Sequence, residues 1–350
     1  MRVLCRSDAA VEIGTGHVFR CVTLAHALAA AGHETTFLCR ELPGNLLSWV
    51  RTQGFETISL PAATGRSERE DAQDCQSALT ARRFDWTIVD HYGLGAAWES
   101  AMAAIADRIL AIDDLGRPHR CDLLLDQSCP NLEHQRYRDA LPPDGEALLG
   151  PRFALIRPEF AQLRPASLRR ARSGIARLLL FMGGSDPCNE TCKALDGISR
   201  LGRADLKVDV VIGQANPHRS AVEAACARLS HANLHVQTSR MAELMAQADC
   251  AVGAGGTATW ERCALGLPSL VTILAENQAS VAQTVQAAGA LSLVGRHEVV
   301  GAADYAAALD RLDGSALGAM SIAAAALCDG RGTERVVRRM MAQKAEPYEA

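Results

Sequence analysis

The sequence predicts an α/β protein made of two doubly wound, Rossmann-like domains. Three observations lead to this fold class. Short apolar runs typical of buried strands alternate with helical patterns from residue 2 onward, and the alternation restarts at residue 177. A glycine turn joins a strand to a helix early in each half, at residues 14–17 and 183–187. Between the halves, residues 164–176 are rich in arginine and poor in large apolar residues, as is typical of an exposed linker.

Composition limits the possible functions. The chain has 350 residues, 48% hydrophobic and 22% charged, so it can bury two cores. Its formal net charge of −4 provides no overall attraction to nucleic acid or to an anionic membrane. The first apolar run is too short for a signal peptide, and no run of eighteen apolar residues follows. We therefore expect a cytoplasmic protein without membrane insertion; the oligomeric state is not determined, although a monomer is favoured.

The cysteines point to a reduced interior. There are 12 of them, no CxxC pair occurs, and most lie in apolar segments. This pattern favours buried free thiols over zinc ligands or disulfides, and no metal site is expected.

The first domain is expected over residues 1–163. Its predicted elements are strand 2–6, a helix through 18–28, strand 34–39, a helix near 45–53, strand 56–60, a polar surface loop 61–75, strands 84–90 and 108–112, and a strand and loop over 123–128.

The second domain is expected over residues 177–328. Its predicted elements are strand 177–182, helix 190–200, strand 207–212, strand 234–237, helix 241–248, a strand from residue 250, a helix through residue 261, strand 269–273 and the alanine-rich helix 302–327. A further helix, 332–343, is predicted after this domain.

A candidate anion site lies between residues 250 and 261. The apolar run ends at Gly255 and Gly256, and Thr257 and Ala258 lead into a helical pattern. Backbone N–H groups are left without partners at such a helix start, so the turn suits a phosphate. Glu261 follows one helical turn later, where its carboxylate can accept hydrogen bonds from a sugar diol. The segment therefore predicts a nucleotide-binding turn.

The glycine turn of the first half carries a candidate base. Gly14 and Gly16 let the backbone approach a ligand closely, and His17 is placed to face that ligand. Arg20, one turn later, can reach the same pocket. The alternative is that His17 is only a residue at the start of a helix.

Polar residues also follow other strands. Asp90 and His91 end a buried strand, where open α/β sheets bind ligands, although such a pair can also serve only to stabilise a loop. Asp113 and Asp114 point to opposite sides of an extended chain, so we expect one structural and one site-facing group. Met241 is more often a core residue than a base-stacking one.

Two resemblances refine this picture. Two βα halves whose glycine turns face a cleft resemble the GT-B glycosyltransferases, in which the nucleotide lies on the C-terminal half. More specifically, the chain resembles the UDP-2,4-diacetamido-2,4,6-trideoxy-β-L-altropyranose hydrolases of pseudaminic acid biosynthesis, which are related to the lipid II N-acetylglucosaminyltransferase. The motifs that carry this resemblance are Arg6-Ser7-Asp8, Gly14-x-Gly16-His17-x-x-Arg20, Asp90-His91-Tyr92-Gly93, Asp113-Asp114, Ala154-Leu155-Ile156-Arg157-Pro158-Glu159-Phe160, Met182-Gly183-Gly184-Ser185-Asp186 and Glu276-Asn277-Gln278.

The resemblance implies release of UDP from the sugar by water, with inversion and without a metal ion or other cofactor. The free sugar would feed the synthesis of a nonulosonic acid for surface glycans such as those of flagellin. His17 would be the general base, oriented by Asp8 or Tyr92. Arg20 and the helix starts near Ser185 and Thr257 would stabilise the departing diphosphate.

The related transferase implies the remaining contacts. Glu261 would bind the ribose, the turn from Gly256 to Ala258 the phosphates, and Met241 the uracil. Asn277 and Gln278, in the motif that begins at Glu276, would bind the sugar. The segment 329–350 would form a last helix that packs back on the first domain.

Two other functions stay open. A UDP-sugar glycosyltransferase would need an acceptor site, often an apolar patch on the first half, and residues 40–80 contain no long basic and apolar stretch to provide one. A non-catalytic protein that binds a sugar nucleotide would not need both His17 and Glu261.

Overall fold

The computed structural model describes residues 1–128, 137 and 140–342, and the chain divides into two compact units. The first unit comprises Met1–Ile156 together with the segment that begins at Arg331, and the second comprises Arg157–Gly330. Each unit has its own sheet and its own apolar core, and each is described by itself below.

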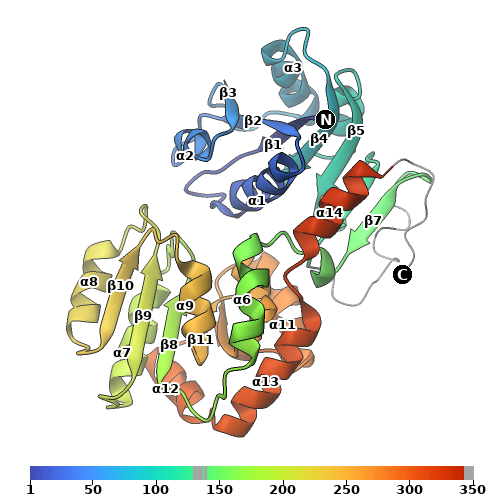
Figure 1. The fold of residues 1–350 in the computed structure, drawn as a ribbon. Coiled ribbons are helices and arrows are strands. Elements are labelled where there is room, and N and C mark those ends of the chain that lie inside the picture. Colours follow the sequence, from blue (N-terminus) through green and yellow to red (C-terminus); the bar gives the residue numbers. More distant parts are fainter. Residues whose placement is uncertain (129–136, 138–139, 343–350) are drawn as a thin grey trace. The chain divides into compact units, whose positions relative to one another are not determined.

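The described part of the first unit contains a 7-stranded sheet in the order β3-β2-β1-β4-β5-β6-β7, with every neighbouring pair parallel (Figure 1). The chain winds outward from β1 to β3, returns to pair β4 with β1, and winds outward again, so its direction switches between β1 and β4. Ligands of open α/β sheets bind at the carboxyl ends of the strands beside such a switch. The strands are β1 (Arg2–Ser7), β2 (Glu34–Arg40), β3 (Glu56–Leu60), β4 (Phe84–Asp90), β5 (Ala106–Ile112), β6 (Leu123–Asp126) and β7 (Glu146–Leu149).

Helices cover both faces of this sheet. They are α1 (Gly16–Ala30), α2 (Leu47–Thr52), α3 (Glu68–Ala78), α4 (Ala96–Met102), the 3-10 helix η1 (Pro151–Phe153) and α14 (Gly332–Met341). The last of these lies beside α1 in Figure 1. Val336 and Met340 of α14 are buried in the same core as Leu24 of α1, so the end of the described chain completes the first unit.

The loop predicted at residues 61–75 is partly helical, because α3 begins at Glu68. Ser67 Oγ accepts a hydrogen bond from the backbone N–H of Glu70, and the Glu70 carboxylate accepts one from the Ser67 N–H. This reciprocal pair is a capping box. The buried face of α3 carries Asp71 as well as Cys75, and a polar residue at a buried position hides the apolar period from sequence reading.

The described part of the second unit contains a 6-stranded parallel sheet in the order β10-β9-β8-β11-β12-β13 (Figure 1). Its winding direction switches between β8 and β11, again at a pair of neighbouring strands. The strands are β8 (Arg177–Phe181), β9 (Lys207–Ile212), β10 (Ala232–Val236), β11 (Cys250–Ala254), β12 (Ser269–Ile273) and β13 (Ser292–Arg296).

The helices of this unit are α6 (Pro158–Leu168), α7 (Glu190–Arg200), α8 (Arg219–Ala227), α9 (Met241–Gln247), α10 (Ala258–Ala264), η2 (Glu276–Gln278), α11 (Ala279–Ala287), α12 (Ala302–Asp310) and α13 (Gly314–Leu327). Residues 164–176, expected to link the domains, lie within this unit instead. The arginines there bind polar groups of the unit. Arg164 donates to the carbonyls of Ala264, Ala325 and Cys328, and the buried Arg172 donates to the hydroxyls of Ser167 and Ser321.

The helix predicted over 302–327 is two helices, broken at residues 311–313. The end of the other predicted helix, at Gln343, and the rest of segment 343–350 lie outside the described residues. Within the described chain, no single helix is long and apolar enough to cross a membrane. One bent pair, Ala302–Asp310 with Gly314–Met341, meets the length and composition test, but Tyr305 and Leu317 of this pair are buried in the core of the second unit.

Candidate functional site

The first candidate site lies at the carboxyl ends of β1 and β4, where Ser7 pairs with Asp90. The chain leaves β1 in a tight loop that closes when the Gly14 N–H donates to the Ala10 carbonyl at 2.8 Å. Gly14 has φ +81°, a left-handed conformation that glycine adopts without strain. Helix α1 then begins at Gly16, which places His17 at the end of β4.

His17 forms a hydrogen-bonded pair with Asp90. The distance from His17 Nδ1 to Asp90 Oδ1 is 2.6 Å. Although burial by itself raises the pKa of Asp90, its interactions with Arg20 and His17 hold that pKa well below the usual value. The ionised carboxylate can only accept, so Nδ1 carries the proton and Nε2 is left as a basic nitrogen. His17 is therefore arranged to take a proton from a ligand or from water.

Arg20 is engaged by carboxylates of the first unit. Its Nε and Nη2 donate to the two oxygens of Asp90 at 2.5 and 2.6 Å, and its Nη1 lies 4.0 Å from Asp114. The side chain is buried. Because this two-point ion pair engages the guanidinium, Arg20 fixes Asp90 rather than reaching for a diphosphate.

Tyr92 lies edge-on to His17, with ring centroids 4.7 Å apart. The turn that carries Tyr92 is held by Arg117, which donates to the carbonyls of His91, Tyr92 and Leu94. Sequence reasoning missed Arg117. The available signal was its position four residues after Asp113, whose carboxylate accepts from Arg117 Nε at 2.7 Å.

Asp8, predicted as a possible partner of His17, is engaged elsewhere. Its Oδ1 accepts hydrogen bonds from Arg6 Nη1 and from the backbone N–H of Arg40, both at 2.7 Å. Asp8 follows the last residue of β1 and its side chain turns toward β2, which explains why Asp90 and not Asp8 orients His17. Its other oxygen faces His91 Nε2 at 3.5 Å.

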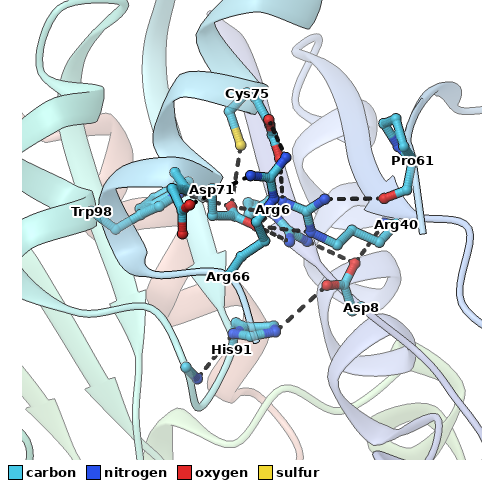
Figure 2. Close-up of polar contacts among 12 residues, drawn as sticks. Arg6, Asp8, Arg40, Pro61, Arg66, Asp71, Cys75, His91 and Trp98 are labelled. Atoms are coloured by element: carbon cyan, nitrogen blue, oxygen red, sulfur yellow. Dashed lines mark hydrogen bonds and ion pairs between the residues drawn. The ribbon is translucent and has the colours of Figure 1, made fainter. Parts of the chain in front are cut away.

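Figure 2 shows the buried ionic network behind Asp8. Asp71 of α3 accepts from Arg6 Nε and Nη2 at 3.1 and 2.9 Å, and from Arg40 Nε and Nη2 at 3.0 and 2.6 Å. Trp98 Nε1 of α4 donates to the same carboxylate at 3.0 Å. One carboxylate thus ties β1, β2, α3 and α4 together beside the candidate site.

His91 is held as a neutral ring. The Gly93 N–H donates to its Nδ1 at 2.9 Å, so the ring proton is on Nε2, which faces Asp8. Burial, followed by the nearby Arg6 guanidinium, lowers the pKa of His91 to about 4. Both ring nitrogens are used within the protein, so His91 shapes the turn after β4.

A second histidine pair lies deeper in the first unit. His119 Nδ1 is 2.6 Å from Glu99 of α4, and its Nε2 is 3.6 Å from Asp113. Although burial lowers it, the interactions with Asp113 and Glu99 raise the pKa of His119 to about 9. Asp113 also accepts N–H groups of Leu115, Gly116 and Arg117, so it is structural, whereas Asp114 lies near Arg20 and Tyr92.

The second candidate site is the turn between β11 and α10. Its residues Gly256, Thr257 and Ala258 are half-buried, and no side chain caps the helix. Among the described residues, no acceptor takes the N–H groups of these three residues. The side chain of Gln278 packs against the turn, 3.3 Å from where a Cβ on Gly255 would lie. The turn therefore presents open donors to a ligand.

Glu261 lies one helical turn after these donors. Burial raises the pKa of Glu261, against the attraction of Arg157, whose Nη2 is 3.7 Å from the carboxylate. Arg157 also pairs with Glu159 at 3.0 Å. One fifth of the Glu261 side chain is exposed, so its carboxylate can accept hydrogen bonds from a ligand.

The helix start predicted near Ser185 is already occupied. Helix α7 begins only at Glu190, and the two oxygens of Asp186 accept the N–H groups of Glu190 and Thr191, each at 2.9 Å. A second anion would meet the Asp186 carboxylate instead of free donors. Ser185 is thus not at an open anion site, which corrects the sequence prediction.

The remaining predicted contacts fall into two groups. Met241 is the first residue of α9 and is buried, as expected of a core residue. Glu276, Asn277 and Gln278 form η2 at the end of β12, where Glu276 pairs with Arg296 at 2.6 Å and Asn277 is exposed.

Across the described residues, no group of three or more histidine, cysteine or acidic side chains is placed to hold a metal ion.

Comparison with known proteins gives distant relatives. No protein-family model matches the chain. It is 23% identical over 287 residues to the uncharacterized protein MJ1062 of Methanocaldococcus jannaschii, and this match covers 79% of the chain but 56% of that protein. It is 24% identical over 246 residues to the UDP-2,4-diacetamido-2,4,6-trideoxy-beta-L-altropyranose hydrolase of Campylobacter jejuni, covering 70% of the chain and 81% of the hydrolase. A shorter match, 35% over 124 residues, is to the spore coat polysaccharide biosynthesis protein SpsG of Bacillus subtilis and covers 37% of it.

Solved structures share the fold. The chain matches MurG of Acinetobacter baumannii with a TM-score of 0.68 at 13% identity, covering 97% of the chain and 98% of MurG. It matches a UDP-GlcNAc 2-epimerase of Neisseria meningitidis, bound to UDP-GlcNAc, with a TM-score of 0.63 at 12% identity, covering 97% of the chain and 100% of the epimerase. The predicted GT-B-like fold of two parallel α/β domains is confirmed.

Proposed function

We propose that this protein hydrolyses a UDP-sugar, with His17 as the general base. The observation that carries the proposal is the 2.6 Å hydrogen bond between His17 Nδ1 and Asp90, which leaves Nε2 free to take a proton. The relatives and fold neighbours, which include a protein named as a UDP-sugar hydrolase and an epimerase bound to UDP-GlcNAc, support a GT-B protein that processes a UDP-sugar.

The proposed reaction needs one water and no cofactor. Water attacks the anomeric carbon while His17 Nε2 takes its proton. The bond between that carbon and the diphosphate oxygen breaks, the electron pair leaves with UDP, and the configuration inverts. General-base assistance of this kind contributes roughly 10²–10⁴-fold to the rate. Tyr92, edge-on to His17, would help to hold the imidazole.

The second unit would hold the nucleotide. The N–H groups of Gly256, Thr257 and Ala258 would donate to the phosphates, and Glu261 would accept from the ribose hydroxyls. Asn277 and Gln278 would meet the sugar. The specific substrate that we propose is UDP-2,4-diacetamido-2,4,6-trideoxy-β-L-altropyranose, after the motifs shared with that hydrolase family, and the product would enter pseudaminic acid synthesis.

The test is to incubate the protein with this UDP-sugar in H₂¹⁸O, with a chelator and no acceptor, and to follow products by NMR and mass spectrometry. We expect UDP without ¹⁸O and a free sugar that first appears as the inverted anomer. Binding without release of UDP would indicate a non-catalytic binding protein. Loss of activity with chelator would contradict the metal-independent reaction.

The ribose contact has its own test. Replacing Glu261 by alanine should weaken UDP binding by about 10–100-fold, because a hydrogen bond to a charged group is lost. Calorimetric titration of UDP measures this, with the exposed Glu223→Ala on α8 as control. Unchanged UDP affinity in the Glu261 variant would remove the ribose role.

A glycosyltransferase is the second candidate, because an apolar surface lies beside the His17 loop. Val11, Ile13 and Phe19 are 74%, 41% and 38% exposed, and Phe19 packs on Trp49 with ring centroids 4.4 Å apart. Such a surface suits an acceptor with an apolar tail. Adding an alkyl glycoside to the assay should leave hydrolysis unchanged if the first proposal holds, whereas a glycosylated product would favour transfer.

A further inference from the structure

Arg262 of α10 is a buried cation that forms no ion pair with any described residue. Only 2% of the residue is exposed. Its Nη2 donates to the Ala254 carbonyl at 2.9 Å and to Thr259 Oγ1 at 3.0 Å, while its Nε has no hydrogen-bond partner. No carboxylate of the described residues forms an ion pair with it. Buried arginines are ordinarily paired, so this one needs a physical explanation.

The guanidinium lies directly beneath the candidate nucleotide-binding turn. Ala254 is the last residue of β11 and Thr259 the second residue of α10, so one nitrogen binds both ends of the turn at residues 255–258. Gly253 makes room for this arrangement. A Cβ at Gly253 would lie 2.7 Å from the Phe181 carbonyl oxygen and 3.0 Å from Arg262 Nη1.

Glu261 attracts the charge of Arg262, but it forms no ion pair with Arg262. Burial lowers the pKa of Arg262 to about 10, so the side chain remains protonated at neutral pH. A cation in a low-dielectric interior attracts anions more strongly than one in water. The turn next to it has N–H groups that meet no acceptor in the described chain, so it can receive an anion.

We propose that Arg262 is a positioning residue for a nucleoside diphosphate: it fixes the turn at residues 255–258 from beneath and supplies the positive charge that favours phosphates there. The inference rests on the proposed function in placing the nucleotide at this turn. It gives the diphosphate a counter-charge in the second unit, since Arg20 of the first unit is engaged by Asp90.

The experiment compares UDP, UMP and uridine as calorimetric ligands of the full chain. In Arg262→Met, which keeps the length of the side chain without its charge, the affinity for UDP should fall about tenfold more than that for uridine, with UMP between them. Arg262→Lys keeps the charge and should restore most of the preference for UDP. Circular dichroism of the nucleotide-free variants checks that each is folded, because Arg262→Met also removes the donor to the Ala254 carbonyl and Thr259 Oγ1.

If Arg262→Met lost the same factor of affinity for UDP, UMP and uridine, Arg262 would only support the fold and the proposal would be overturned. The proposal would also be overturned if none of the three affinities changed. If the wild-type protein bound none of the three ligands, the proposed function itself would fail. Wild-type binding of UDP with an unmoved ratio would overturn only the role of Arg262.

Discussion

His17 and His119 of the first unit each form a short hydrogen bond from Nδ1 to a carboxylate, but we expect the first to act as a base and the second to stabilise the fold. His17 and His119 each place Nδ1 2.6 Å from a carboxylate oxygen. The difference lies at the other ring nitrogen: Nε2 of His17 has no partner in the described chain, whereas Nε2 of His119 faces Asp113 at 3.6 Å in a side chain that is 1% exposed. The single carboxylate beside His17 leaves its Nε2 able to accept a proton. The two carboxylates beside His119 stabilise the protonated form of that ring.

The largest effect that this contrast predicts is on turnover. His17→Asn should reduce the rate of UDP release by roughly 10²–10⁴-fold, because the proton acceptor is gone. UDP affinity should stay within about twofold, since the nucleotide contacts proposed above lie in the second unit. Steady-state kinetics and calorimetry measure the two quantities. Full hydrolysis by this variant would end the general-base assignment.

Removing the carboxylate that orients His17 should cost less. Asp90→Asn should slow turnover by roughly 10²-fold, because an amide oxygen can still accept from Nδ1 but no longer stabilises a charged imidazole. The variant also leaves the buried Arg20 with only Asp114, 4.0 Å away, so the free energy of unfolding should fall by up to about 3–5 kcal/mol. Urea unfolding checks the second effect, and Asp85→Asn, which lies at the exposed end of β4, is the control. A variant with normal kcat would show that His17 needs no orienting group.

His119 should behave in the opposite way. His119→Gln breaks a buried ionic contact on both sides, so we expect a loss of about 3–5 kcal/mol in the free energy of unfolding. The rate per folded molecule should be unchanged, because the contacts of this ring in the described chain are to Glu99 and Asp113 and not to His17. Activity corrected for the folded fraction makes the comparison. A large fall in that corrected rate would mean that the two pairs are coupled.

The smallest predicted effect is the pH dependence of stability. The pKa of His119 is raised to about 9 in the folded protein, against about 6.5 in an unfolded chain. The folded state therefore binds the proton more tightly, and the stability is fully present below pH 6.5 and is lost as the pH rises through 9. The loss should be about 3 kcal/mol. Urea titrations between pH 6 and 9.5 measure it, and a slope that persists in His119→Gln would assign the effect to other groups.

Local sequence patterns were sufficient to predict the strands and the first glycine turn. The apolar run of β4 and the Gly14-x-Gly16-His17 loop each lie within a few residues, so periodicity and turn chemistry predict them. The partner of His17 was not predictable in this way. Asp90 lies 73 residues away along the chain, and only the register that pairs Ser7 with Asp90 brings the two together.

The two glycine turns of the second unit show a second limit. Both read as a strand, two glycines and a hydroxyl residue before a helix, and both were predicted to bind phosphate. The turn at 183–187 carries Asp186, whose carboxylate satisfies the start of α7, whereas the turn at 255–258 has no acid. An acidic residue just before a helix is a readable signal, but the inward direction of Arg262 beneath the other turn depends on packing.

The contacts of Asp71 oppose local unfolding of the first unit. Because this carboxylate binds Arg6, Arg40 and Trp98 at once, α3 cannot separate from the sheet without exposing two buried guanidinium groups. Local fraying at the carboxyl ends of β1 and β2 is thereby suppressed. Amide hydrogen exchange there should proceed through global unfolding, so the carboxyl ends of β1 and β2 should be among the slowest-exchanging parts of the protein.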